Sequence, residues 1–202
     1  MSDSCCPPPA PSVDRGYRRI LWIALIVNAA MFAVEVASGI GSGSVSLLAD
    51  AIDFFGDASN YALSLAVLAM AATIRSRAAL FKAACMALFG VFVLARALWV
   101  LSSGSVPEPV TMGVVAIAAL AANVGVAFPV SIQQKRDANM RSVWICSRND
   151  AFGNLAVGLA ALGVFGTGSA WPDLAVAAAM AVLALAGAYS VGRQARMELA
   201  TA

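Results

Sequence analysis

The sequence predicts an all-α, polytopic integral membrane protein with six transmembrane helices and both termini in the cytoplasm. Hydrophobic residues make up 61% of the 202 residues and charged residues only 12%, whereas a soluble domain carries about 25% charge. The net charge of +2 is too small to indicate a partner such as nucleic acid. Six apolar stretches follow one another, each about as long as a helix that crosses a bilayer.

The six expected membrane helices are separated by short connections rich in glycine, serine and proline. In chain order we expect them at residues 19–40, 44–72, 78–102, 110–132, 139–165 and 171–191. The segments 103–109 and 166–169 are typical of such helix-breaking connections. Because the connections are short, consecutive helices should pack as antiparallel neighbours.

Apart from Arg96 and Arg148, which lie within the third and fifth expected spans, lysine and arginine lie in or next to alternate connections. They precede the first span, separate the second from the third and the fourth from the fifth, and follow the sixth, at Arg15, Arg18, Arg19, Arg75, Arg77, Lys82, Lys135, Arg136, Arg141, Arg193 and Arg196. The other three connections have only Glu108 and Asp173 as charged residues. Cytoplasmic loops carry the excess of basic residues, so this alternation places both termini in the cytoplasm.

These spans divide the chain into three expected parts. Residues 1–17 form a disordered cytoplasmic tail, 18–193 a six-helix transmembrane domain, and 194–202 a short cytoplasmic tail. The first tail lacks the apolar core of a signal peptide. Its adjacent Cys5 and Cys6 could bind a soft metal, although incidental thiols in a mobile tail are the simpler interpretation. Function should therefore reside in the helix bundle.

Three aspartates lie within the second expected span. Asp53 and Asp57 are four residues apart and share a helix face, and Asp50 lies near the same stripe. A charged side chain inside a bilayer costs roughly 2.5–3.5 kcal/mol on insertion scales, and such residues mark cation or proton sites. Three carboxylates this close cannot all stay ionised without a cation, which predicts a site that exchanges protons for metal. The alternative is a carboxylate stripe paired with arginines in the bundle core.

The fifth expected span offers a second pair of ligands. Cys146 and Asp150 are four residues apart, and Asn154 adds an oxygen one turn further on. Two helices that each offer such a pair can close a four-coordinate site of oxygen and sulfur ligands, which suits zinc-like ions. A cysteine in an apolar helix can equally be packing filler. The pattern leaves open whether Asp50, Asn154 or Glu35 joins the site.

Several of these segments together resemble the cation diffusion facilitators. The motifs that carry the resemblance are Glu35 ahead of Gly39, the run 44–51 followed by Asp53 and Asp57, the run 139–141 followed by Cys146 and Asp150, and the run 171–173. The resemblance covers about residues 18–193 and implies metal ligands at Asp53, Asp57, Cys146 and Asp150. Cys146 stands where the family usually places histidine or aspartate, which could favour softer ions such as cadmium or weaken the site.

The resemblance also implies a function and its partners. It predicts a cation-transport domain that exports zinc, or a related ion such as cadmium, cobalt, iron or manganese, by proton antiport. It implies no prosthetic group, no enzymatic activity and a place in a bacterial inner membrane. The sequence lacks the family's usual cytoplasmic metal-binding domain and its histidine-rich loop, so we expect a homodimer that forms through the membrane helices.

Two other functions remain open at this stage. One is a membrane protein that shares the fold but acts as a metal sensor or as a partner subunit of a competent transporter. The other is a membrane enzyme, which the sequence disfavours because it contains no histidine and no evident nucleophile–base pair.

Overall fold

The computed structural model describes residues 15–66, 72–133 and 138–200, with the side chains of 15, 17, 72, 75 and 129–149 outside the described part. The described backbone forms six α-helices and no strand. They are α1 (Arg15–Ser42), α2 (Val45–Ala66), α3 (Ala72–Ser103), α4 (Pro109–Gln133), α5 (Ala138–Thr167) and α6 (Trp171–Ala200). The prediction of an all-α protein with six helices is confirmed. Helix α6 continues well past the expected end of the sixth span, to Ala200.

Five of these helices are long and apolar enough to cross a membrane: α1, α3, α4, α5 and α6. Helix α2 differs because Asp50, Asp53 and Asp57 interrupt its apolar sequence. Its 22 residues still span about 33 Å, which exceeds the roughly 30 Å hydrocarbon core of a bilayer. Residues 45–52 of α2 are all buried, so the first half of this helix is shielded from lipid by its neighbours.

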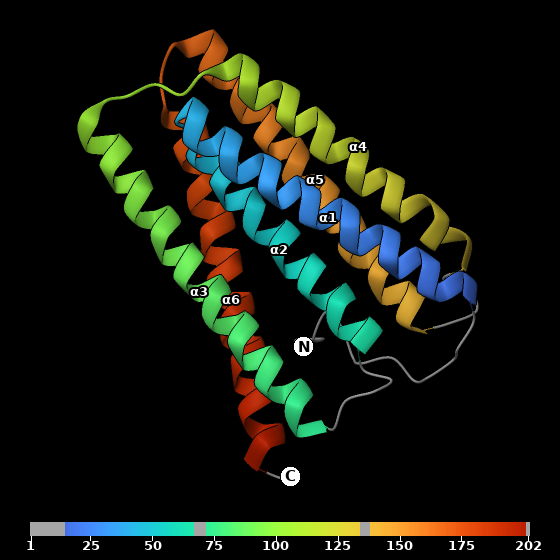
Figure 1. Ribbon diagram of the computed structural model, residues 1–202. Coiled ribbons are helices and arrows are strands. Elements are labelled where there is room, and N and C mark those ends of the chain that lie inside the picture. Colours follow the sequence, from blue (N-terminus) through green and yellow to red (C-terminus); the bar gives the residue numbers. More distant parts are fainter. Residues whose placement is uncertain (1–14, 67–71, 134–137, 201–202) are drawn as a thin grey trace.

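Helix α2 lies at the centre of the bundle and packs against α1, α3, α5 and α6. Helix α1 packs along α2, α4 along α5, and α3 along α6 (Figure 1). The α3–α6 pair and the group formed by α1, α2, α4 and α5 meet near the start of α2. They diverge toward the opposite end, where α3 starts and α6 ends (Figure 1).

The start of α2 is fixed by a carboxylate from another helix. Asp173, in the first turn of α6, is fully buried. It accepts hydrogen bonds from the backbone N–H groups of Val45 (2.8 Å) and Ser46 (3.0 Å) and from the hydroxyl groups of Ser44 (2.7 Å) and Ser46 (2.6 Å). The first N–H groups of a helix lack partners within the helix, and its N-terminus favours negative charge. Asp173 therefore joins α6 to α2.

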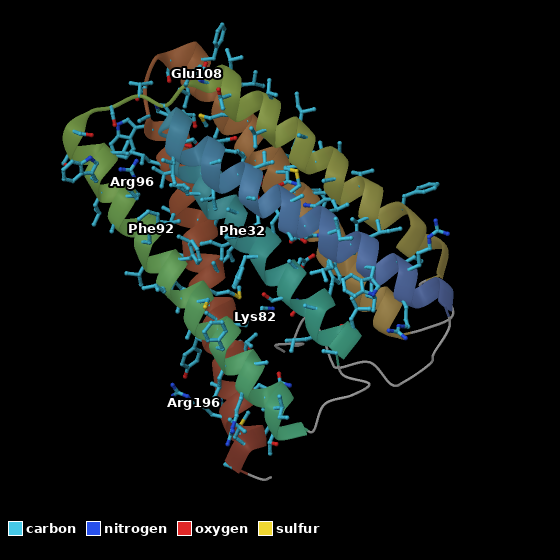
Figure 2. All side chains as sticks on the ribbon, viewed as in Figure 1. Phe32, Lys82, Phe92, Arg96, Glu108 and Arg196 are labelled. Carbon is cyan, nitrogen blue, oxygen red and sulfur yellow. The ribbon has the colours of Figure 1, made fainter. Side chains whose placement is uncertain are left out.

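Two further features hold the helices in register. A Cβ at Gly39 would stand 2.8 Å from Cγ of Leu48, so glycine at this position lets α1 approach α2 closely. The rings of Phe32 of α1, Phe55 of α2 and Phe89 of α3 pack together with centroids 5.6–6.1 Å apart. Phe32 points from α1 toward α3 in Figure 2. This aromatic contact joins α3 to the α1–α2 pair.

Candidate metal site

Helices α2 and α5 bring Asp57 and Asp150 together. The two carboxyl groups lie within hydrogen-bonding range of each other. Asp57 is 9% exposed and Asp150 is half-buried. Two carboxyl groups can form such a bond only when one of them carries a proton, since a carboxylate has no hydrogen to donate. The convergence expected from the two spaced motifs is therefore present, and the role of these residues as metal ligands stays a prediction.

Asp53 lies one turn before Asp57 on α2 and is half-buried. It is close enough for its charge to act on Asp150, and Asp57 lies within the same range of Asp53. The described residues contain no group of three or more aspartate, glutamate, cysteine or histidine side chains close enough to hold an ion as they stand. A metal held by all three aspartates would thus require their side chains to move closer together.

The fourth expected ligand is Cys146. It lies on α5 one turn before Asp150, but its side chain is outside the described residues. The structure therefore describes three of the four expected ligands and brings two of them, Asp57 and Asp150, within hydrogen-bonding range of each other.

Two residues that the sequence did not assign to the site adjoin Asp57. The hydroxyl of Tyr61, one turn further along α2, donates a hydrogen bond to Oδ2 of Asp57 (3.0 Å). Lys82 of α3 is only 7% exposed, donates a hydrogen bond to Oδ1 of Asn60, and is close enough for its charge to act on Asp57. Lys82 lies where α3 faces the central helices (Figure 2).

A signal for Lys82 was present in the sequence. Lys82 belongs to the basic residues that predict the topology, although it falls inside the expected third span, at 78–102. Lysine within an apolar helix usually has a carboxylate or polar partner in the bundle. The alternative interpretation pairs these aspartates with arginines. The structure instead places Lys82 beside Asp57, and Arg96 stands about four turns further along α3 (Figure 2). The side chain of Arg148 is outside the described residues.

Asp50 faces a different neighbour from Asp57. Its carboxyl group lies within hydrogen-bonding range of the carboxyl group of Glu35 on α1. Glu35, Asp50 and Asn154 are all almost fully buried. The three residues whose role the sequence left open are therefore inside the bundle. Asp50 and Glu35 form a second carboxyl pair, and Asp50 remains close enough for its charge to act on Asp53 and Asp150.

Comparison with known proteins gives the family. A family model described as the cation efflux transmembrane domain matches residues 21–200. The chain belongs to the cation efflux family. This confirms the resemblance to the cation diffusion facilitators, a family of transporters rather than enzymes, and it agrees with a multi-pass membrane protein.

Two curated relatives resemble most of this chain. The metal cation efflux system protein CzcD of Cupriavidus metallidurans and the cation efflux system protein CzcD of Alcaligenes sp. strain CT14 are each 30% identical to this chain over 176 residues. The match covers 80% of this chain and 55% of each relative. The chain thus spans little more than half the length of the curated relatives it matches.

Proposed function

We propose that this chain exports a divalent metal cation from the cytoplasm in exchange for protons. Zinc is the first candidate, with cadmium, cobalt, iron and manganese as related cargoes. The observation that carries the proposal is the contact between Asp57 of α2 and Asp150 of α5, in a chain of the cation efflux family. Asp53 and Cys146 complete the proposed ligand set, one helical turn before each of these aspartates.

Charge balance gives the exchange its mechanism. The Asp57–Asp150 contact requires a proton while no metal is bound, because two ionised carboxylates would repel each other. A divalent ion that enters from the cytoplasm replaces that proton and satisfies both carboxylates. Protons that arrive from the opposite side then release the metal by neutralising its ligands. The hydrogen bond from Tyr61 keeps the Asp57 carboxyl group oriented through the cycle.

The proposal also includes the membrane in which the transporter lies and its oligomeric state. We place the chain in a bacterial inner membrane, where an efflux protein would meet both cytoplasmic metal and a proton gradient. Large apolar side chains are exposed along α1, α3, α4, α5 and α6, including Phe81, Leu98, Ile117, Leu162 and Leu183. These faces contact lipid, and a homodimer would form through one of them.

Proteoliposome transport tests the proposal. Purified protein should carry Zn²⁺ across the bilayer and move protons in the opposite direction, detected with a metal dye on one side and a pH dye on the other. Asp57→Asn and Asp150→Asn should each lower flux at least about tenfold, since each removes one charge that balances the ion. Glu108→Gln changes an exposed acidic residue outside the spans and is the matched control.

Two results of the transport assay would count against the proposal. Wild-type flux in both Asp57→Asn and Asp150→Asn would remove the proposed site. The absence of any flux from the wild-type protein, with metal still bound, would instead favour a sensor or a partner subunit.

A further inference from the structure

A second group of polar residues lies inside the bundle, and Asp53 is close enough for its charge to act both on Glu35 of this group and on Asp150. The group consists of Glu35 of α1, Asp50 of α2 and Asn154 of α5, and is called here the Glu35 cluster. The exposed fractions of these three side chains are 0%, 1% and 1%. Helix α5 passes directly beside Asp50, because a Cβ at Gly153 would stand only 3.6 Å from Oδ1 of Asp50. Asn154 is the next residue along that helix.

Five side-chain atoms of the Glu35 cluster lack a hydrogen-bond partner unless Glu35 and Asp50 share a proton. Both oxygens of Glu35, Oδ2 of Asp50, and both amide atoms of Asn154 are buried with no hydrogen-bond partner among the described residues, if the carboxyl groups are ionised. More than about 90% of buried polar groups in proteins have a partner, and each exception calls for a reason. Other buried polar residues of this bundle are satisfied: Asn28 donates to the carbonyl of Ala24, and Asp173 accepts four hydrogen bonds. The unpaired atoms are therefore a local property of the Glu35 cluster.

The position of the cluster fits a place on the path of the transported ion. Asp50 precedes Asp57 by about two helical turns, which is about 10 Å along α2. It lies toward the start of α2, which the distribution of lysine and arginine assigns to the non-cytoplasmic side. An ion that leaves the Asp57–Asp150 contact in that direction would next meet the Glu35 cluster.

We propose that Glu35, Asp50 and Asn154 form a second divalent-cation site, which receives the ion from Asp57 and Asp150 before its release. Two carboxylates carry a charge of −2, which either one divalent ion or two protons neutralises. The same exchange of metal for protons can therefore be repeated at this site. Its three side chains offer only oxygen, without a thiolate, so it should hold soft ions less tightly than a site that contains Cys146. The proposal rests on the direction of transport in the proposed function.

Binding of Mn²⁺ tests this site separately from transport. Mn²⁺ suits oxygen ligands, and electron paramagnetic resonance counts it directly. All proteins would carry Cys5→Ser and Cys6→Ser to remove the terminal thiols. The wild-type bundle should bind two Mn²⁺ ions per chain. Asp57→Asn combined with Asp150→Asn should leave one, and the addition of Glu35→Gln should leave none. Asn28→Ala in place of Glu35→Gln alters a buried amide on the same helix whose nitrogen donates to the carbonyl of Ala24, and should keep the remaining ion.

A variant that binds Mn²⁺ more tightly distinguishes the proposed site from an effect of misfolding, because misfolding would weaken binding. Asn154→Asp adds a third carboxylate to the Glu35 cluster, and it should tighten Mn²⁺ binding in the Asp57→Asn, Asp150→Asn protein at least about tenfold. Unchanged or weaker affinity would overturn the proposal. The absence of bound Mn²⁺ from the Asp57→Asn, Asp150→Asn protein would also overturn it. The same holds if an Mn²⁺ ion stays bound after Glu35→Gln is added to that protein. Failure of the wild-type protein to move Zn²⁺ would contradict the proposed function alone, because the binding count does not depend on transport.

Discussion

Asp57 has both negatively and positively charged neighbours. Asp150 and Asp53 add negative charge, while the ammonium group of Lys82 adds positive charge from α3. Lys82 thus offsets part of the charge that a divalent ion would neutralise. A buried lysine in this position lowers the repulsion between carboxylates in the empty site, and it competes with the metal for the same negative charge.

Removal of the Lys82 charge should therefore strengthen metal binding. Lys82→Met keeps most of the length of the side chain, and we predict that its affinity for Zn²⁺ rises roughly tenfold, which equals about 1.4 kcal/mol. Isothermal titration of the detergent-solubilised protein measures this, with Lys82→Arg as the control that keeps the charge. An affinity equal to that of the wild type would show that Lys82 has no electrostatic part in the site.

The sequence revealed the Asp57–Asp150 contact more readily than the residues around it. Spacing of four residues on each of two helices identified both aspartates, because that periodicity is a local property of the chain. The partners of Asp50, Asp57 and Asp173 come from other helices, and no local pattern reports which helices become neighbours.

At the scale of helices, the ends of α2 and α4 depend on acidic side chains. Asp173 receives the N-terminus of α2 inside the protein, and exposed Glu108 caps α4 through the N–H groups of Val110 (2.9 Å) and Thr111 (2.6 Å). The sequence shows both residues as acidic positions in connections, and Asp173 also as part of the motif at 171–173, but it reveals neither cap. It also predicts an end of the sixth span at 191, where hydropathy falls, whereas α6 continues and Glu198 accepts a hydrogen bond from Ser76 of α3.

The buried cap at Asp173 should matter most for stability. Asp173→Ala leaves two hydroxyl and two N–H groups at the start of α2 without their acceptor, and should lower the free energy of unfolding by about 2–4 kcal/mol. Thermal unfolding in detergent measures the loss. Ser46→Ala removes only one of these donors and should cost about 1 kcal/mol. Equal midpoints for Asp173→Ala and the wild type would contradict this account of α2.

The cap at Glu108 should depend on pH. Hydrogen bonds from the hydroxyl and backbone of Thr111, and from the backbone of Val110, hold the pKa of Glu108 below its ordinary value of 4.5. A carboxyl group with a lower pKa in the folded state contributes stability above its unfolded pKa, and loses that contribution as pH falls through the folded pKa. Glu108→Gln should therefore reduce the thermal midpoint at pH 7, and the difference from wild type should shrink below pH 4.5. A difference that is constant with pH would contradict the assignment.

At the scale of the whole molecule, six helices form one bundle around α2, and the α3–α6 pair diverges from the other four toward one end (Figure 1). The distribution of lysine and arginine predicts that this end faces the cytoplasm. Asp57 lies toward that end of α2 and the Glu35 cluster toward the other, so the two groups are ordered along the proposed direction of export.

Labelling of single cysteines tests this orientation. Ser105 is exposed in the connection between α3 and α4. In a chain otherwise free of cysteine, Ser105→Cys should react with a membrane-impermeant maleimide added outside intact cells, while a cysteine introduced at Thr201 should react only after the membrane is opened. The reverse pattern would invert the topology and the direction of transport.

The most direct test of the central claim is the position of the bound ion. Crystals grown with Zn²⁺ and measured at its absorption edge should show an anomalous peak between α2 and α5, about 2.0–2.2 Å from oxygens of both Asp57 and Asp150. A Zn²⁺ ion bound elsewhere, with these two carboxyl groups apart and neither one touching it, would contradict the account.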